Sequence, residues 1–187
     1  MAIILASQSP RRKEILTDLG IDFKIIVSDA DESSNENNPE KLVEILAERK
    51  ANAISDQAVE NDTIIAADTV VVLGDKILGK PKDKHDAENM LTILSNNVHK
   101  VITGVCVKKG DNIIVSHDIT YVYFKKLSKD TIDNYLSSNE YIDKAGSYAI
   151  QGIGGSFVEK IEGSYTNVVG LPEELTIKLL DEIKTCV

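Results

Sequence analysis

A carboxylate and a hydroxyl interrupt the most apolar stretch of this sequence. Asp68 and Thr69 stand inside residues 63–73, an almost continuous apolar run. An ionised carboxylate in apolar surroundings is costly unless a base, a metal or several hydrogen-bond donors accompany it. Functional sites often tolerate that cost, so Asp68 is the first candidate for a catalytic group. The alternative is an Asp that caps a turn at a strand end.

A cluster of cations lies near the N-terminus. Arg11, Arg12 and Lys13 follow Ser7-Gln-Ser-Pro at the predicted start of a helix. Cations are unfavourable there, because a helix N-terminus carries partial positive charge. A docked phosphate would remove the conflict, since backbone N–H groups, hydroxyls and guanidinium groups all bind it. The segment is therefore either an anion site that includes Ser7 or a solvated basic turn.

Three further side chains suit a nucleotide ligand. Lys50 lies on the apolar face of a predicted helix. Its ammonium either reaches water along the methylene stem or emerges beside a bound phosphate. Lys80 adds a cation shortly after the Asp68 strand, although its Gly-Lys-Pro setting is also that of an ordinary turn. Gln151 precedes several glycines, and its amide offers the paired donor and acceptor that can recognise a nucleobase edge.

The loop of residues 28–38 is rich in acids, among them Asp29, Asp31 and Glu32. Loop carboxylates can hold Mg²⁺, but an acidic loop can equally be solvated surface. Asp29-Ala-Asp31 also matches the short metal motif of nucleotide-sugar transferases, which is frequent by chance. The three histidines show no metal-ligand spacing, and the sequence has neither a P-loop nor a GxGxxG fingerprint.

Alternating strands and helices are expected to position these groups. We predict strands at residues 2–6, 22–27, 63–73, 101–109 and 113–124, the last two joined as a hairpin. We predict helices at residues 10–19, 39–59, 84–95 and 128–138 and from Pro172 onward, with Ser9 and Asn38 as N-caps. This order predicts one α/β domain over residues 1–187 with a mixed sheet.

Composition narrows the classes of protein. The chain has 187 residues, of which 42% are hydrophobic and 27% charged, with a net charge of −9. That acidity argues against general nucleic-acid binding. No apolar run is long enough to span a membrane, and the first one is too short for a signal peptide. The two cysteines form no CxxC pair, so we expect a cytoplasmic protein without disulfides.

Eight segments together resemble the Maf family of nucleotide pyrophosphatases, in order along nearly the whole chain. They are Leu5–Arg12, Asp29–Glu32, Lys50, Ala67–Val70, Gly79–Pro81, Thr103-Gly104, Asp143–Gly146 and Tyr148–Gly152. The resemblance implies an elongated mixed β-sheet flanked by helices, with two lobes around a central cleft, as in inosine triphosphate pyrophosphatases. It also implies dependence on Mg²⁺ or Mn²⁺, a cytoplasmic location and a homodimer.

The resemblance also assigns roles to single residues. Asp68 matches the family's catalytic acid, a proton acceptor. Arg11, Thr69 and Gln151 match positions linked to substrate choice and resemble the branch that acts on dTTP and UTP. The residues that the resemblance suggests for phosphate binding are Ser7, Arg12, Lys50 and Lys80. Those that it suggests for metal binding are Asp31, Glu32 and Asp68.

Two questions stay open at this stage. Where the family is expected to have Glu in the acidic loop, this chain has Asp31 followed by Glu32, so either acid could be the metal ligand. The alternative to an enzyme is a nucleotide-binding regulator of cell division without catalysis.

Overall fold

The structure is a computed structural model that describes residues 2–59 and 61–185. The chain divides into two compact units. Unit 1 holds the described residues up to Thr69, together with Thr103–Asp118 and those from Gly170 onward. Unit 2 holds Val70–Ile102 and Ile119–Val169. Strands β3 (Thr63–Leu73), β5 (Val98–Lys109) and β6 (Asn112–Phe124) contribute residues to both units.

The strands form a mixed seven-stranded sheet in the order β2-β1-β3-β5-β6-β7, with β4 paired to β3. In unit 1, β1 (Ile3–Leu5) runs parallel to β2 (Phe23–Ile25) and to β3. In unit 2, β4 (Lys76–Leu78) is antiparallel to β3, and β7 (Val158–Glu162) is antiparallel to β6. The predicted α/β class with a mixed sheet flanked by helices is therefore confirmed.

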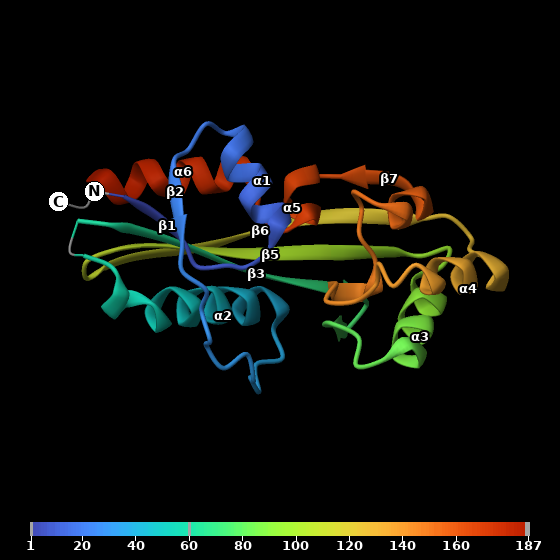
Figure 1. Cartoon of the computed structure of the whole chain (residues 1–187). Helices are drawn as coiled ribbons and strands as arrows, with labels where there is room; N and C mark the ends of the chain where they lie inside the picture. The colour runs from blue at the N-terminus through green and yellow to red at the C-terminus, as the bar shows by residue number, and fades with distance from the viewer. Residues whose placement is uncertain (1, 60, 186–187) are drawn as a thin grey trace. The chain divides into compact units, whose positions relative to one another are not determined.

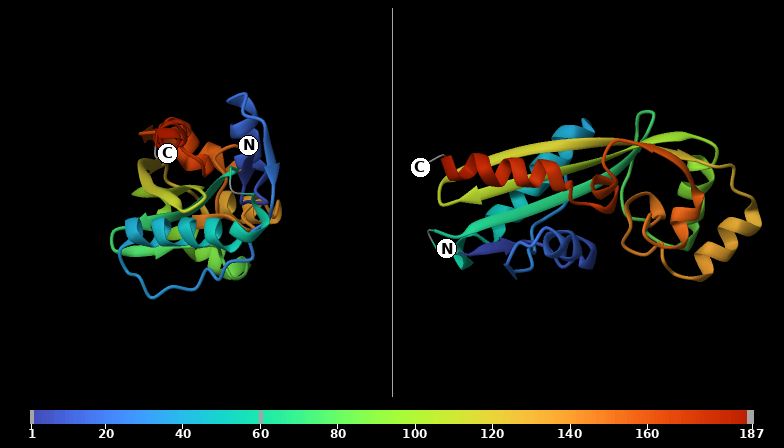
Figure 2. Two further views of the ribbon diagram at one scale, coloured as in Figure 1. Left: turned by 90° about the vertical axis from the view of Figure 1, so that its left-hand side faces the viewer. Right: turned by 90° about the horizontal axis from the view of Figure 1, so that it is seen from above.

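Three helices belong to unit 1, namely α1 (Pro10–Asp18), α2 (Pro39–Ala53) and α6 (Glu173–Thr185). Helices α2 and α6 cover opposite faces of this unit's strands (Figures 1 and 2). The side chain of Asn38 accepts hydrogen bonds from the backbone N–H groups of Glu40 and Lys41, as predicted for an N-cap. Ser9 occupies the N-cap position of α1, but its side chain makes no capping hydrogen bond.

Helix α2 ends earlier than the predicted boundary at residue 59. After Ala53 the chain continues as a short 3₁₀ helix, Ser55–Gln57. The Ser55 hydroxyl donates to the carbonyl oxygen of Ala51 at 3.3 Å, so it satisfies a carbonyl that a longer helix would have used. Such a bond slightly weakens the backbone ladder at this end of the helix.

The backbone of α2 lies directly on β5 in unit 1. A Cβ atom added to Gly104 would lie 2.4 Å from the carbonyl oxygen of Val43, so only glycine permits this approach. Ala47, Ala51 and Ile54 pack with apolar residues of the strands and share a buried cluster with Cys106. This packing places the side of α2 that carries Lys50 against the sheet.

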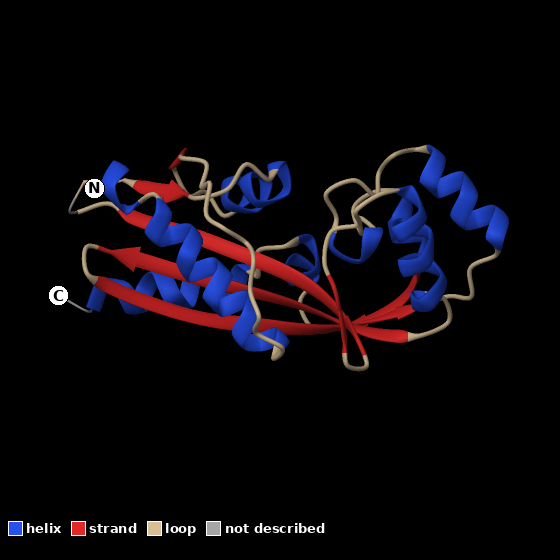
Figure 3. Ribbon diagram, turned by 90° about the horizontal axis from the view of Figure 1, so that it is seen from below, coloured by secondary structure: helices blue, strands red, loops and turns tan. Residues whose placement is uncertain are grey.

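Unit 2 is built around two helices and an aromatic core. Helices α3 (Lys84–Leu94) and α4 (Lys129–Ser137) lie side by side (Figure 3). Phe124, Tyr148 and Phe157 pack edge to face in the core, and the His99 ring joins them. The sequence did not predict β7, because charged residues dominate its alternation. It also did not predict the short helix α5 (Tyr165–Val169).

The hairpin of β5 and β6 turns through Gly110 and Asp111, with a φ of 55° at Gly110, as its sequence predicts.

Within the described residues, no helix is both long and apolar enough to cross a membrane.

Candidate active site

The strand register brings Asp68 and Thr69 of β3 next to the segment that leads from β1 into α1. Leu5 pairs with Ile65, and the N–H of Ala6 donates to the Ile65 carbonyl at 2.8 Å. The first strand then leaves the sheet at Ser7, while β3 continues through Asp68 and Thr69. Successive side chains on a strand point to opposite faces. Asp68 accordingly meets α2, and Thr69 meets α1.

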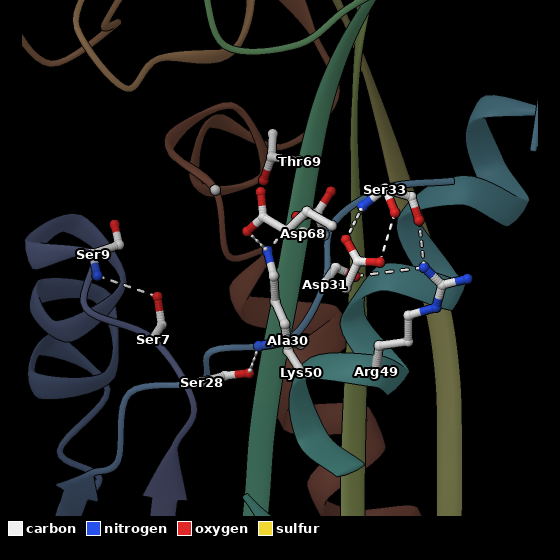
Figure 4. A network of polar contacts seen from close by, with 12 residues as sticks. Ser7, Ser9, Ser28, Ala30, Asp31, Ser33, Arg49, Lys50, Asp68 and Thr69 are labelled. Carbon is white, nitrogen blue, oxygen red and sulfur yellow. Dashed lines mark hydrogen bonds and ion pairs between the residues drawn. The ribbon is translucent and has the colours of Figure 1, made fainter. Parts of the chain in front are cut away.

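Lys50 joins two carboxylates in unit 1. Its Nζ lies 2.5 Å from Asp68 Oδ1 (Figure 4). The same Nζ lies 2.9 Å from Glu32 Oε1. The side chains of Lys50 and Asp68 are only 13% and 12% exposed, whereas that of Glu32 is 47% exposed. The Lys50 ammonium therefore ends in an acidic site instead of simply reaching water. The partner that a buried Asp68 requires is this lysine.

Arg12 is held by a separate set of contacts on the other side of β3. Its Nε donates to the Gly170 carbonyl at 2.7 Å, its Nη1 to Ser7 Oγ at 3.3 Å and its Nη2 to Thr69 Oγ1 at 3.2 Å. Thr69 Oγ1 also lies 3.0 Å from Thr103 Oγ1. A guanidinium has five N–H donors, so these bonds fix its plane and still leave donors for a ligand.

The charge balance around Arg12 is set by burial and by its neighbours. Desolvation lowers the pKa of the Arg12 guanidinium from its usual value, and the adjacent Arg11 lowers it further, whereas Asp68 and Glu32 act in the opposite direction. Arginine remains a cation after such shifts. Two neighbouring cations beside a helix start thus favour an anionic ligand.

Asp31 and Glu32, the two candidate metal ligands of the loop, make different contacts. Asp31 accepts hydrogen bonds from the backbone N–H and the hydroxyl of Ser33, at 2.9 and 2.6 Å, which lower the pKa of its carboxyl group. Arg49 of α2 donates to the Ser33 carbonyl at 2.6 Å and so anchors this loop (Figure 4). Asp31 and Arg49 line an open pocket. Only Glu32 reaches the Lys50–Asp68 pair.

The remaining predicted residues lie in both units. Ser7 is buried, and its Oγ accepts from the N–H of Ser9 as well as from Arg12. Arg11 follows Pro10 in the first turn of α1. Lys80 and Gln151 belong to unit 2 and are exposed. There the N–H of Gly146 donates to the Gly79 carbonyl at 3.0 Å, which joins two of the segments singled out in the sequence.

The donor set at Asp68 fits a hard cation in part. Among residues 2–59 and 61–185, no three His, Cys, Asp or Glu side chains come together as a metal site. Asp68 and Glu32 nevertheless direct carboxylate oxygens at one point, which is now held by the Lys50 ammonium. Mg²⁺ commonly takes one or two protein carboxylates and completes its shell with water and phosphate oxygens.

Comparison with known proteins identifies the family. The family model described as Maf-like protein matches residues 2–183. The chain belongs to the Maf family.

Several curated relatives of this Maf-like protein share nearly half of its residues. A protein of Thermoanaerobacter sp. (strain X514) is 46% identical over 98% of this chain and 96% of its own length. One from Pyrococcus furiosus is 50% identical over 96% and 94%, respectively. Both are named dTTP/UTP pyrophosphatase. Among solved structures, the Ham1 protein of Staphylococcus aureus is weakly similar, with a TM-score of 0.45 and 16% identity over 66% of this chain and 72% of its own.

Sequence reasoning missed two contacts of the Maf-like site. The Gly170 carbonyl anchors Arg12. Gly170 has a φ of 121°, and the only sequence signal for this conformation is that the residue is a glycine. Arg49 of α2 anchors the acidic loop through the Ser33 carbonyl. Backbone contacts between distant segments carry no sequence signature.

Proposed function

We propose that this Maf-like protein hydrolyses dTTP and UTP to the nucleoside monophosphate and pyrophosphate. The observation that carries the proposal is the buried Asp68 carboxylate, held by Lys50 beside Glu32 in the same unit as the Arg12 cluster. A carboxylate among fixed cations suits water attack on a phosphoryl group. The choice of dTTP and UTP rests on the names of relatives that are 46–50% identical over nearly the whole chain.

In this proposal Asp68 orients the attacking water and accepts its proton. Water adds to the α-phosphorus, the bond from that phosphorus to the α–β bridging oxygen breaks, and pyrophosphate leaves with that oxygen. Lys50 holds the Asp68 carboxylate in an ion pair before attack and would also donate to a phosphate oxygen of the substrate. Arg12, whose plane is fixed by three hydrogen bonds, would donate its remaining N–H groups to the triphosphate.

Metal binding belongs to the same proposal. Glu32 and Asp68 would hold Mg²⁺ or Mn²⁺, with Lys50 shifting from between them toward the phosphates. We favour Glu32 over Asp31 because both Asp31 oxygens already accept hydrogen bonds from Ser33. When bound, the cation supplies charge neutralisation at the phosphate oxygens and at the leaving pyrophosphate.

Substrate selection is assigned to Arg11, Thr69 and Gln151, with Lys80 as a further phosphate contact. The amide of Gln151 matches the donor and acceptor pattern of a uracil or thymine edge. Thr69 also accepts a hydrogen bond from Arg12. In this proposal Thr69 therefore takes part in substrate selection and also positions a phosphate-binding residue. A central cleft, a homodimer and a cytoplasmic location stay predictions.

A panel assay tests the reaction. The purified protein is incubated with common nucleoside triphosphates and Mg²⁺ or Mn²⁺ in ¹⁸O-labelled water, and the products are separated by anion exchange. We expect monophosphate and pyrophosphate from dTTP and UTP, with the label in the monophosphate, which reports attack at the α-phosphorus. Nucleoside diphosphate and inorganic phosphate would contradict the proposed bond. Binding without turnover would favour the non-catalytic regulator.

A further inference from the structure

The segment that carries Gln151 is held by a carboxylate from another part of unit 2. Glu140 Oε2 accepts a hydrogen bond from the backbone N–H of Ile153 at 2.9 Å, and Glu140 Oε1 accepts one from the N–H of Gly154 at 3.0 Å. Each carboxylate oxygen thus has its own backbone donor. Hydrogen bonds to an ionised acceptor are about twice as strong as those between neutral groups. Glu140 is therefore a strong anchor for this segment.

Gly152 makes this contact possible by its lack of a side chain. A Cβ atom at Gly152 would lie 2.4 Å from Glu140 Cδ and 2.4 Å from Glu140 Oε2. A side chain at Gly152 would therefore displace the Glu140 carboxylate from its present position. The carboxylate lies directly on the backbone of the residue that follows Gln151.

The backbone at Gln151 is set by the turns on either side of it. The N–H of Gly152 donates to the Ala149 carbonyl at 3.3 Å, so Gln151 is a central residue of a turn. The N–H of Gly155 then donates to the Gly152 carbonyl at 3.1 Å. A Cβ atom at Gly155 would lie 2.3 Å from the Ile150 carbonyl, so the second turn folds back on the first. Glu140 is the side chain that binds this double turn from outside it.

We propose that Glu140 is a positioning residue for nucleobase selection, acting through Gln151. This inference rests on the proposed function, because it gives Gln151 the task of recognising the base. Gln151 lies within this double turn, so the two Glu140 hydrogen bonds help to fix the course of its main chain. Without both Glu140 hydrogen bonds, the amide would sample several orientations and lose its preference for one base edge.

The test compares Glu140→Gln with wild type and with Glu159→Gln. The Glu140→Gln side chain has the same size but only one acceptor oxygen, so one of the two backbone N–H groups is left facing an amide NH₂. Glu159 is an exposed glutamate of the same unit and serves as the matched control for loss of one charge. The readout is the ratio of kcat/KM for dTTP to kcat/KM for dCTP.

We expect Glu140→Gln to lower this ratio about tenfold, mainly through a higher KM for dTTP, with kcat nearly unchanged. Glu159→Gln should keep the wild-type ratio. In a Gln151→Ala background the same Glu140 substitution should change the ratio less than twofold, because the group it positions is gone. A wild-type ratio in Glu140→Gln would overturn the proposal, as would an equal loss in both backgrounds.

A second readout separates this inference from the reaction itself. Amide hydrogen exchange at Ile153 and Gly154 should accelerate in Glu140→Gln and not in Glu159→Gln, whether or not the protein turns over any nucleotide. If the wild type cleaves no triphosphate, the proposed function fails while the exchange still reports the anchor. Should Glu140→Gln not fold, Glu140→Asp keeps the charge with a shorter reach and takes its place in each comparison.

Discussion

Replacing Asp68 by Asn separates the chemical role of this carboxylate from its structural role. The substitution preserves size and leaves an oxygen that can accept from Lys50, but it removes the negative charge and the ability to take a proton. Removing a positioned general base costs about 10² to 10⁴ in rate. We therefore expect kcat for dTTP to fall by at least about 100-fold, with KM changing little.

The structure also bounds the loss of stability. A hydrogen bond to a charged group contributes about 1.5–3 kcal/mol, and Lys50 keeps its contact with Glu32 at 2.9 Å after the substitution. The free energy of unfolding should thus fall by no more than about 2 kcal/mol. For a chain of this size that corresponds to about 4–8 °C in melting temperature, which leaves the protein folded at 25 °C.

The assay is steady-state kinetics with dTTP, paired with thermal unfolding of the same sample. Asp75→Asn is the matched control, since Asp75 is exposed and lies just beyond the same strand. It should retain both activity and melting temperature. Asp68→Asn with more than a tenth of the wild-type kcat would refute the assignment of Asp68 as the base. A variant that is unfolded at 25 °C would show that the role of this ion pair in stability has been underestimated.

Three further outcomes follow from the geometry. Arg12→Lys keeps the charge but cannot make all three hydrogen bonds to Ser7, Thr69 and Gly170. We expect kcat/KM for dTTP to fall about 10- to 100-fold in kinetic assays. An unchanged value would mean that the charge alone suffices. Gly104→Ala drives a methyl group into the backbone of α2 and should lower the free energy of unfolding by about 1–3 kcal/mol in urea titrations, whereas Gly79→Ala, which meets nothing within 4 Å, should have little effect. Burial lowers the pKa of His99 from 6.5 to about 4, so the folded state binds this proton less tightly than the unfolded state. The neutral His99 therefore favours the folded state fully above pH 6.5, and this stabilisation is lost as the pH falls toward 4. Between pH 7 and pH 5 the wild type should therefore lose about 2 kcal/mol more than His99→Gln, and parallel losses in urea titrations at the two pH values would contradict this.

The sequence predicted the regular part of the fold well, because strong local signals determine it. Each of these signals involves only a few neighbouring residues. Examples are the apolar run of β3, the Gly-Asp turn of the hairpin and the Asn38 cap. The predicted helix 39–59 extends beyond Ala53, because the helical pattern does not show where α2 gives way to a 3₁₀ turn. β7 was missed because its exposed charged residues hide the alternation.

The sequence singled out candidate residues for the site, but it could not show the contacts between them. The cost of burying a charge singled out Asp68, and the apolar face of α2 singled out Lys50, yet their pairing depends on how α2 packs on the sheet. Our preference for Glu32 over Asp31 as a metal ligand depends on a local turn through Ser33, whose hydrogen bonds occupy both Asp31 oxygens. Glu140 and Arg49 gave no signal, because both act on backbone atoms of segments distant in sequence.

The bond between Arg12 and the Gly170 carbonyl also has a consequence for the order of events during protein synthesis. Its two partners are separated by 158 positions, and unit 1 is assembled from three separate stretches of chain. A ribosome that adds about 5–20 residues per second needs about 5–20 s to proceed from Thr69 to Gly170. During that interval the apolar β3 strand has emerged while Arg12 still lacks its main-chain acceptor. The nascent chain thus passes through a stage in which β3 has been synthesised and the contacts of Arg12 are still incomplete.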